Sequence, residues 1–222
     1  MNKAIILVSG GLDSCVTAAT AHDAGFNLAF LHLDYGQRTE VRELKAFTDI
    51  VDFYSVSEVL SVRMSHLVEI GGSCLTDTNI EVPKANLDNS DIPISYVPFR
   101  NANMISVAVS WAEVIGASHI FIGAVEEDSS GYPDCRRDFF DAFEKLIIQG
   151  TRPETSIKLE TPLIHLDKSQ IIKKGVSLKA PLHLTWSCYQ AENIPCGDCD
   201  SCALRARGFE KAGIIDPILD LA

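Results

Sequence analysis

The chain has 222 residues, of which 46% are hydrophobic and 22% charged. This composition is typical of one globular domain with a small appendage and excludes a disordered or fibrous protein. Asp and Glu outnumber Lys and Arg by 30 to 19, which gives a net charge of −11, whereas proteins that bind a phosphate backbone usually carry the opposite balance. No apolar run approaches the roughly 20 residues that a bilayer span requires. We therefore expect a cytoplasmic protein with no membrane anchor and no nucleic-acid partner.

The first 33 residues predict a strand, a helix and a second strand. Ala4–Val8 and Leu28–Leu33 are nearly unbroken apolar runs, and the intervening helix, at about Asp13–Ala24, is set off by glycines on both sides. Strands that are apolar on both faces belong to parallel sheets with helices on either side. The sequence therefore predicts a doubly wound α/β fold with a mostly parallel sheet.

Later segments continue the alternation. They are helices at about Glu40–Val51, Asn103–Ile115 and Arg137–Gln149 and a strand at His119–Ile122. In the third of these helices, Phe139, Phe143, Leu146 and Ile147 fall on one helical face, which we expect to pack in the core.

Two segments depart from this pattern. Residues Leu75–Asn101 are rich in Asp, Asn, Pro and Ser and lack a sustained period, which is typical of a functional loop or lid. Near the end of the chain, Asp200–Ala212 predicts a helix stopped by Gly213. We expect a nucleotide-binding domain in residues 1–181, with residues 182–222 forming a metal-binding loop and a final helix packed on it.

A glycine-containing loop follows the first strand and opens the first helix. Its sequence is Ser9-Gly10-Gly11-Leu12-Asp13-Ser14. Backbone N–H groups and the positive end of the helix dipole favour an anion there, the serine hydroxyls can donate to phosphate oxygens, and Asp13 can hold a divalent cation. The loop lacks the lysine of a Walker A motif and the third glycine of a dinucleotide fingerprint. The alternative is a tight turn in which Ser and Asp only cap the helix.

Four of the seven cysteines form a C-x7-C-x2-C-x2-C cluster, which argues against a secreted disulfide framework. They are Cys188, Cys196, Cys199 and Cys202. Four thiolates leave no open coordination position, so the spacing predicts a structural zinc ion rather than a catalytic one. An iron–sulfur cluster, which is disfavoured by the lack of a downstream Cys-Pro, and a catalytic dithiol are the alternatives.

Both motifs resemble those of known enzymes. Ser-Gly-Gly-x-Asp-Ser resembles the pyrophosphate loop (PP-loop) of the ATP pyrophosphatases, which have an adenine nucleotide alpha hydrolase-like fold. Three further stretches, Val97–Asn101, Gly123–Arg136 and Thr185–Tyr189, complete a pattern similar to the 7-cyano-7-deazaguanine synthases of queuosine biosynthesis, from Ser9 to Pro217. At Phe99 that family more commonly has glycine.

The resemblance implies an ATP-dependent ligase. Members of the family convert 7-carboxy-7-deazaguanine and ammonia to 7-cyano-7-deazaguanine through activated acid and amide intermediates. They release AMP and pyrophosphate, or ADP and phosphate if the activation is a phosphorylation. The resemblance also implies Mg²⁺, one structural Zn²⁺ per chain and a homodimer.

The resemblance further implies a set of site residues. ATP would contact Val8, Ser9, Gly10, Gly11, Leu12, Asp13, Ser14 and Asp34; the catalytic residues would be Asp13, Ser14 and Lys168; the substrate would contact Arg100, Asn101, Glu127, Asp128, Tyr132 and Asp134; and zinc would be held by Cys188, Cys196, Cys199 and Cys202. Arg100 would neutralise a phosphate or the substrate carboxylate, and Lys168 resembles a phosphate-contacting lysine. The alternative is that each charged residue outside the two motifs is an ordinary solvated side chain, and that Asp34 belongs to a plain turn.

Two other functions remain open from the sequence. A PP-loop enzyme could transfer an amide or sulfur to a nucleotide or tRNA, although the acidic balance counts against tRNA. A zinc-containing regulatory module that binds a partner or DNA would leave the glycine loop unexplained.

Overall fold

The computed structural model describes residues 2–87, 91–126 and 131–219. These residues form a five-stranded parallel sheet in the order β3-β2-β1-β4-β5. The strands are β1 (Lys3–Leu7), β2 (Asn27–Asp34), β3 (Glu58–Arg63), β4 (His119–Phe121) and β5 (Lys158–Glu160). The helices are α1 (Leu12–Asp23), α2 (Glu40–Tyr54), α3 (His66–Ile70), α4 (Arg100–Ile115), α5 (Arg137–Gly150), α6 (Lys168–Ser177) and α7 (Asp200–Ala212), with 3₁₀ turns η1 (Pro133–Cys135) and η2 (Leu182–Leu184).

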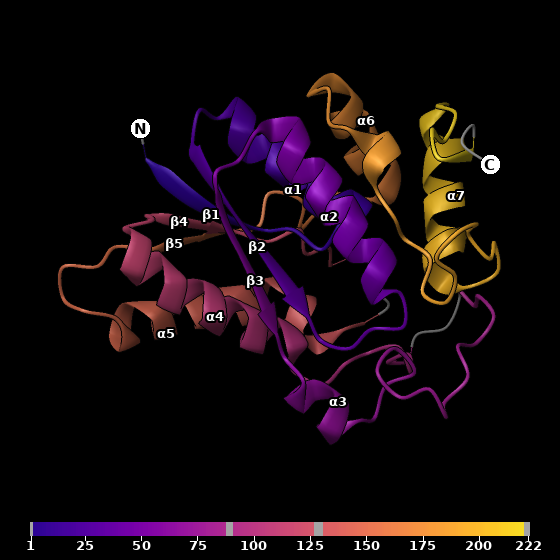
Figure 1. The fold of residues 1–222 in the computed structure, drawn as a ribbon, viewed down its shortest axis with the longest axis horizontal. Helices are drawn as coiled ribbons and strands as arrows, with labels where there is room; N and C mark the ends of the chain where they lie inside the picture. The colour runs from indigo at the N-terminus through magenta and orange to yellow at the C-terminus, as the bar shows by residue number, and fades with distance from the viewer. Residues whose placement is uncertain (1, 88–90, 127–130, 220–222) are drawn as a thin grey trace.

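Helices cover both faces of the sheet, which confirms the doubly wound prediction. Helices α1, α2 and α6 lie on one face, while α4 and α5 lie on the other (Figure 1). Strand β1 shows why both faces are apolar, because Ile5 packs with the α4 and α5 side chains and Ile6 packs with those of α1 and α6. Both side chains are fully buried, so each residue of the central strand stabilises one of the two cores.

The strand order creates a crevice at the carboxyl end of the sheet. From β1 the chain passes to β2 and β3 on one side, then crosses over to β4 and β5 on the other side. The segments after β1 and β4 therefore diverge, and in open α/β sheets ligands bind at this switch point.

Two edge strands and one helical face differ from the sequence prediction. Alternate residues of β3 are exposed, as expected at a sheet edge, and β5 has only three residues, so neither gave a clear apolar run. In α5 the prediction for Leu146 was wrong, because 59% of it is exposed while Phe140 is fully buried. The buried stripe of α5 follows Phe140, Phe143 and Ile147, so the helix faces the sheet at a slightly different angle.

In the long loop before α4, one arginine binds three backbone carbonyl groups. Arg38 donates to the carbonyl oxygens of Cys74 at 2.7 Å, Asp77 at 2.9 Å and Ile80. Helix α4 then begins at Arg100, three residues earlier than predicted. Phe99, at the family's glycine position, has a left-handed φ of 57°, so the backbone there keeps a conformation that glycine adopts easily.

After the cysteine-containing loop, the chain returns to the face of the sheet that α1, α2 and α6 cover. Helix α7 packs against α6, and the two stand together beyond the sheet in Figure 1. Phe209 of α7 joins the core formed by α1 and β1. Within the described ranges, none of the helices has both the length and the apolar composition needed to span a bilayer.

Candidate active site

A cleft of about 300 Å³ lies at the switch point. It is lined by the PP-loop, the end of β2, the start of α4, the segment after β4, Lys168 and residues of the C-terminal segment. Stretches that are far apart in the sequence, including Ser9–Ser14, Arg100 and Trp186, therefore share one space. Of the predicted ATP-binding residues, Val8, Ser9, Gly11, Leu12, Asp13 and Ser14 line it.

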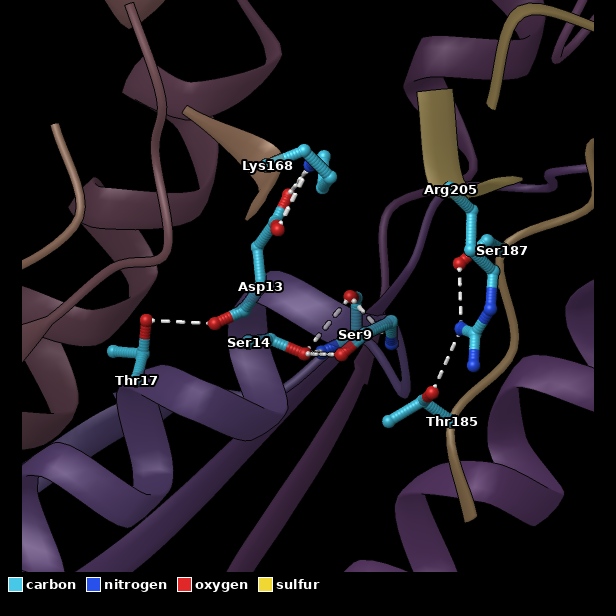
Figure 2. Close-up of polar contacts among 9 residues, drawn as sticks. Ser9, Asp13, Ser14, Thr17, Lys168, Thr185, Ser187 and Arg205 are labelled. Carbon is cyan, nitrogen blue, oxygen red and sulfur yellow. Dashed lines mark hydrogen bonds and ion pairs between the residues drawn. The ribbon is translucent and has the colours of Figure 1, made fainter. Parts of the chain in front are cut away.

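The PP-loop is held in a tight turn by its own hydroxyls. The Ser14 hydroxyl donates to the Gly11 carbonyl oxygen at 2.9 Å and lies 3.2 Å from the Ser9 hydroxyl (Figure 2). The Gly11 amide donates to Ser9 Oγ at 3.2 Å. Gly11 is the N-cap residue of α1, so the cap position offers no side-chain acceptor to the first amides of the helix. This arrangement favours an anion from outside the loop over the capping alternative.

Gly10 allows α2 to pack directly against this loop. Its φ is +90°, and a Cβ atom there would lie 2.6 Å from the Glu43 carbonyl oxygen and 3.0 Å from Ala46 Cβ. No other residue type combines that conformation with that contact. Gly10 itself does not line the cleft. Instead, it allows the first turn of α2 to lie close to the loop.

Asp13 and Lys168 meet across the cleft although 155 residues separate them. Lys168 Nζ lies 2.9 Å from Asp13 Oδ1 and 2.8 Å from Oδ2 (Figure 2). Lys168 begins α6, whose N-cap Asp167 forms a capping box with Gln170. Gly208 of α7 leaves room for the methylenes of Lys168, because a Cβ there would clash with them. The two predicted catalytic charges thus neutralise each other in this structure.

At the start of α4, the partly buried Arg100 lies against an aromatic ring. Arg100 Nη1 donates to the Tyr35 hydroxyl at 2.9 Å, and its guanidinium lies 5.0 Å from the centre of the Tyr35 ring. The Tyr132 hydroxyl lies 2.7 Å from Ser95 Oγ. Arg100, Asn101 and Tyr132 all line the cleft, which places a cation, an amide and an aromatic side chain in the same space as Lys168.

Four acidic residues predicted for the site either do not line the cleft or lie outside the described residues. Asp134 accepts from the Asn101 amide at 2.9 Å and does not line the cleft; burial raises its pKa, while this hydrogen bond lowers it. Asp34 accepts from the Gly36 amide at 2.9 Å and lies 3.5 Å from Arg63, also outside the lining. Glu127 and Asp128 fall outside the described residues. Their contacts with ligands stay predictions.

The four clustered cysteines form a site of the size that a tetrahedral metal requires. Their sulfur atoms all lie within 4.8 Å of one another, and Cys196 Sγ is 3.9 Å from Cys202 Sγ. Four sulfurs bound to zinc at about 2.3 Å would be about 3.8 Å apart. The Ala191 and Cys196 amides also donate to Cys188 Sγ, at 3.3 and 3.4 Å, which stabilises a thiolate. The cluster therefore fits a metal ion.

The segment that carries the four cysteines also contacts the PP-loop. The Trp186 amide donates to the Gly10 carbonyl oxygen at 2.9 Å, and Trp186, Ser187 and Tyr189 line the cleft. With these contacts the site combines a PP-loop and a cysteine cluster in one structure.

Comparison with known proteins agrees with this combination. Residues 3–213 match the family described as queuosine biosynthesis protein QueC. The chain belongs to this family. Two relatives named 7-cyano-7-deazaguanine synthase, from Chlorobium phaeobacteroides and Chloroherpeton thalassium, are 58% and 59% identical, each over 97% of this chain and 96% of their own. The chain is therefore an ATP-dependent enzyme of the QueC family.

Two solved structures share its fold. A 4-thiouridine synthetase in complex with RNA and ATP is 16% identical, with a TM-score of 0.53 over 96% of this chain and 50% of its own. A predicted subunit of a tRNA methyltransferase from Methanocaldococcus jannaschii is 13% identical, with a TM-score of 0.53 over 96% of this chain and 89% of its own. These likenesses confirm the PP-loop type of fold.

Sequence reasoning missed an acidic residue in the cleft. Glu43 accepts from the Thr39 hydroxyl at 2.8 Å and from Gln37 Nε2 at 3.1 Å, and all three side chains line the cleft. Burial raises the pKa of Glu43 to about 7, although the two hydrogen bonds and Arg100 oppose the rise. The position of Glu43 in the first turn of an amphipathic helix gave no signal, because acidic residues are common there.

It also missed a buried ion pair whose arginine lines the cleft. Arg205 donates to both Asp216 oxygens, at 2.6 and 2.9 Å. Its Nη1 also donates to the Thr185 and Ser187 hydroxyls, at 2.9 and 3.2 Å, and Figure 2 shows these two bonds. Arg205 and Asp216 are 5% and 7% exposed. The pair ties α7 to both the cleft segment and the end of the chain. Its only sequence signal was an arginine three residues after Cys202.

Proposed function

We propose that this chain converts 7-carboxy-7-deazaguanine and ammonia to 7-cyano-7-deazaguanine at the expense of ATP, as part of queuosine biosynthesis. The observation that carries the proposal is the shared cleft, in which the PP-loop and Lys168 face Arg100 and its aromatic neighbours. The family membership and the names of the relatives support the same reaction.

The chemistry requires the two ends of the cleft to act together. A carboxylate oxygen is a poor leaving group, whereas AMP departs readily from an acyl adenylate. The substrate carboxylate attacks the α-phosphorus of ATP and releases pyrophosphate. Ammonia then adds to the acyl carbon, and loss of AMP and a proton from this adduct gives the amide. The amide oxygen attacks the α-phosphorus of a second ATP and releases pyrophosphate, and loss of AMP and the two amide protons yields the nitrile. The protein supplies positioning and charge neutralisation.

We assign roles to the residues accordingly. The PP-loop amides and the Ser9 and Ser14 hydroxyls would bind the pyrophosphate portion of ATP, and Val8 and Leu12 would border it. The phosphates would draw Lys168 away from Asp13. Asp13 could then hold Mg²⁺, a cation that supplies neutralisation of phosphate charge.

At the other end of the cleft, Arg100 would bind the substrate carboxylate and Tyr132 would stack on the base. We keep Asn101, Asp134, Glu127, Asp128 and Asp34 as proposed contacts that remain to be tested.

We also propose that residues 182–222 form a zinc-binding extension of a nucleotide-binding domain in residues 1–181. The closed set of four thiolates supports a structural ion, which would hold α7 against α6. Thiolates stay reduced in the cytoplasm, where we place the enzyme. Small molecules would be its partners, since a net charge of −11 disfavours nucleic acid.

A homodimer is the proposed oligomeric state. An apolar groove between α4 and α5 is lined by Phe99, Phe139, Phe143 and Leu146, among others, and Phe99 and Leu146 are each 59% exposed. Light scattering should report twice the chain mass, and Leu146→Glu should shift it toward the monomer.

The decisive assay supplies the purified protein with MgATP, an ammonium salt and 7-carboxy-7-deazaguanine. We expect AMP, pyrophosphate and a product with the mass of the nitrile, none of which should form when the acid is omitted. If ADP and phosphate form in place of AMP and pyrophosphate, the activating step is a phosphorylation of the substrate oxygen. Absence of ATP turnover with this acid would exclude the proposed function.

A further inference from the structure

Glu43 is the carboxylate that the scheme above leaves without a role. Its backbone touches the PP-loop through the Gly10 contact, and Arg100 is close enough to influence it electrostatically. It therefore borders both the loop assigned to ATP and the arginine assigned to the substrate carboxylate.

The surroundings of Glu43 are built to hold a carboxylate in one orientation. Thr39 and Gln37 are 1% and 4% exposed, and each donates to a different oxygen of Glu43. Gln37 is itself fixed, because its Oε1 accepts from the Tyr35 amide at 3.0 Å. Each carboxylate oxygen keeps a further lone pair, since an ionised carboxylate offers about four acceptor sites. The carboxylate can thus accept from a small ligand without losing these two bonds.

The charge of Glu43 is not balanced by a direct ion pair. Among the described residues, no Lys or Arg nitrogen is placed within 4.0 Å of its carboxylate, in contrast to Asp13, which has Lys168 at 2.8 Å. A partly buried anion without such a partner favours a small cation. The reaction has one such substrate, because ammonia in water near neutral pH is mostly ammonium.

We propose that Glu43, with Thr39 and Gln37 around it, forms the subsite that binds ammonium, the nitrogen donor of the reaction. The proposal rests on the proposed function and adds the place where the second substrate enters. Ammonium has only N–H donors, and the site offers it the two Glu43 oxygens and the Thr39 hydroxyl oxygen as acceptors.

The Thr39 hydroxyl has an additional property that suits this role. It lies 2.8 Å from Glu43 Oε1 and 3.3 Å from the Cys188 carbonyl oxygen, so its one proton has two acceptors within reach. When the hydroxyl donates to Cys188, its oxygen faces Glu43 as an acceptor. The Thr39 hydroxyl and the two Glu43 oxygens can therefore all accept hydrogen bonds from an ammonium ion that binds at the carboxylate.

The test compares two nitrogen nucleophiles. In Glu43→Gln at about pH 8, we expect the KM for ammonium to rise by about tenfold or more, the loss that accompanies removal of one charge-assisted hydrogen bond. The KM values for ATP and the acid should stay within about twofold, as expected when only one ligand loses a contact. Hydroxylamine, which is neutral at that pH and does not need a carboxylate, should still trap the activated acid as the hydroxamate with release of AMP.

Matched variants separate binding from folding. Glu40→Gln removes a 43%-exposed carboxylate from the same first turn of α2 and should leave the ammonium KM unchanged. If Glu43→Gln does not fold, Thr39→Val should raise the ammonium KM while Thr39→Ser, which keeps the hydroxyl, should not. An unchanged ammonium KM in Glu43→Gln, or an equal loss of the ammonium and hydroxylamine reactions, would overturn the subsite.

Two further outcomes are distinct. A raised KM for MgATP alone would make Glu43 a magnesium residue and likewise overturn the proposal. If the unaltered enzyme releases no AMP with the acid and ammonium, both the proposed function and the ammonium subsite are excluded. If it does release AMP, the proposed function stands, and the Glu43 and Thr39 variants alone test the subsite.

Discussion

The cleft and the neighbouring segment that carries the four cysteines differ in their effect on stability. Groups in the cleft lower the stability of the unliganded protein, whereas groups in the cysteine segment raise it. The cleft and the PP-loop beside it contain a partly buried carboxyl with a raised pKa, a glycine at φ +90° and an ion pair that a ligand would separate. The cysteine segment contains four sulfurs spaced for one metal ion and a buried, fully hydrogen-bonded ion pair. Binding sites require groups that are strained or unsatisfied without their ligands, so a neighbouring segment has to supply the stability that they cost.

Loss of a cysteine should have the largest effect. Cys202→Ser removes one of four metal ligands, and we expect loss of the bound metal and destabilisation by about 5 kcal/mol or more, because metal binding is coupled to folding. Metal analysis and urea unfolding measure this. Cys74→Ala, at a buried cysteine outside the cluster, should keep one metal per chain and cost only about 1 kcal/mol. A metal-replete, fully stable Cys202→Ser protein would contradict the ligand set.

Asp13 should show the reverse pattern, with a loss of activity and little loss of stability. Asp13→Ala should lower AMP release by about 100-fold or more, the effect of removing one charge-stabilising group from an active site. Its ion pair with Lys168 is partly exposed, so the free energy of unfolding should change by less than about 1 kcal/mol. Asp23→Ala, at the exposed far end of α1, is the control. Normal AMP release from Asp13→Ala would refute the assigned role.

The pH dependence of unfolding should show how much the burial of Glu43 in the cleft destabilises the protein. Its folded pKa of about 7 lies above the ordinary value of 4.5, so the protein loses stability as the pH rises from about 5 to 7. Glu43→Gln lacks this loss and should gain up to about 3 kcal/mol relative to the unaltered protein between pH 5 and pH 8. Urea unfolding at the two pH values, with Glu40→Gln as the reference for other titrating groups, checks it. Parallel pH profiles for Glu43→Gln and the unaltered protein would contradict the raised pKa.

The smallest effect should separate backbone strain from steric contact at the PP-loop. Gly10 and Gly25 both have positive φ, at +90° and +79°, but a Cβ at Gly25 would meet no atom within 4 Å. Gly25→Ala should cost about 1 kcal/mol from strain alone, and Gly10→Ala about 1–2 kcal/mol more, since α2 must move. Thermal unfolding of the two variants gives the difference. Equal losses would mean that the contact between the loop and α2 is adjustable.

Local patterns in the sequence predicted the parts of the site that depend on neighbouring residues. The PP-loop, the cysteine spacing and the helix ending at Gly213 are each set within a few residues, and the structure has them where they were expected. The burial of Glu43 and its bonds to Thr39 and Gln37 depend on how α2 packs against the loop. The Arg205–Asp216 pair depends likewise on how the chain end folds back. Such contacts leave no period or motif in the sequence.

Gly208 limits how far the final helix can be strengthened. A glycine inside a helix costs about 1 kcal/mol relative to alanine, so it is an obvious position to change when a more robust enzyme is wanted. Here a methyl group would push against the Lys168 stem and approach Ile172 Cδ1 to 3.0 Å. A gain in helix propensity would therefore be offset by displacement of the lysine that faces the PP-loop. Thermostabilisation of α7 should begin at its solvent-facing positions.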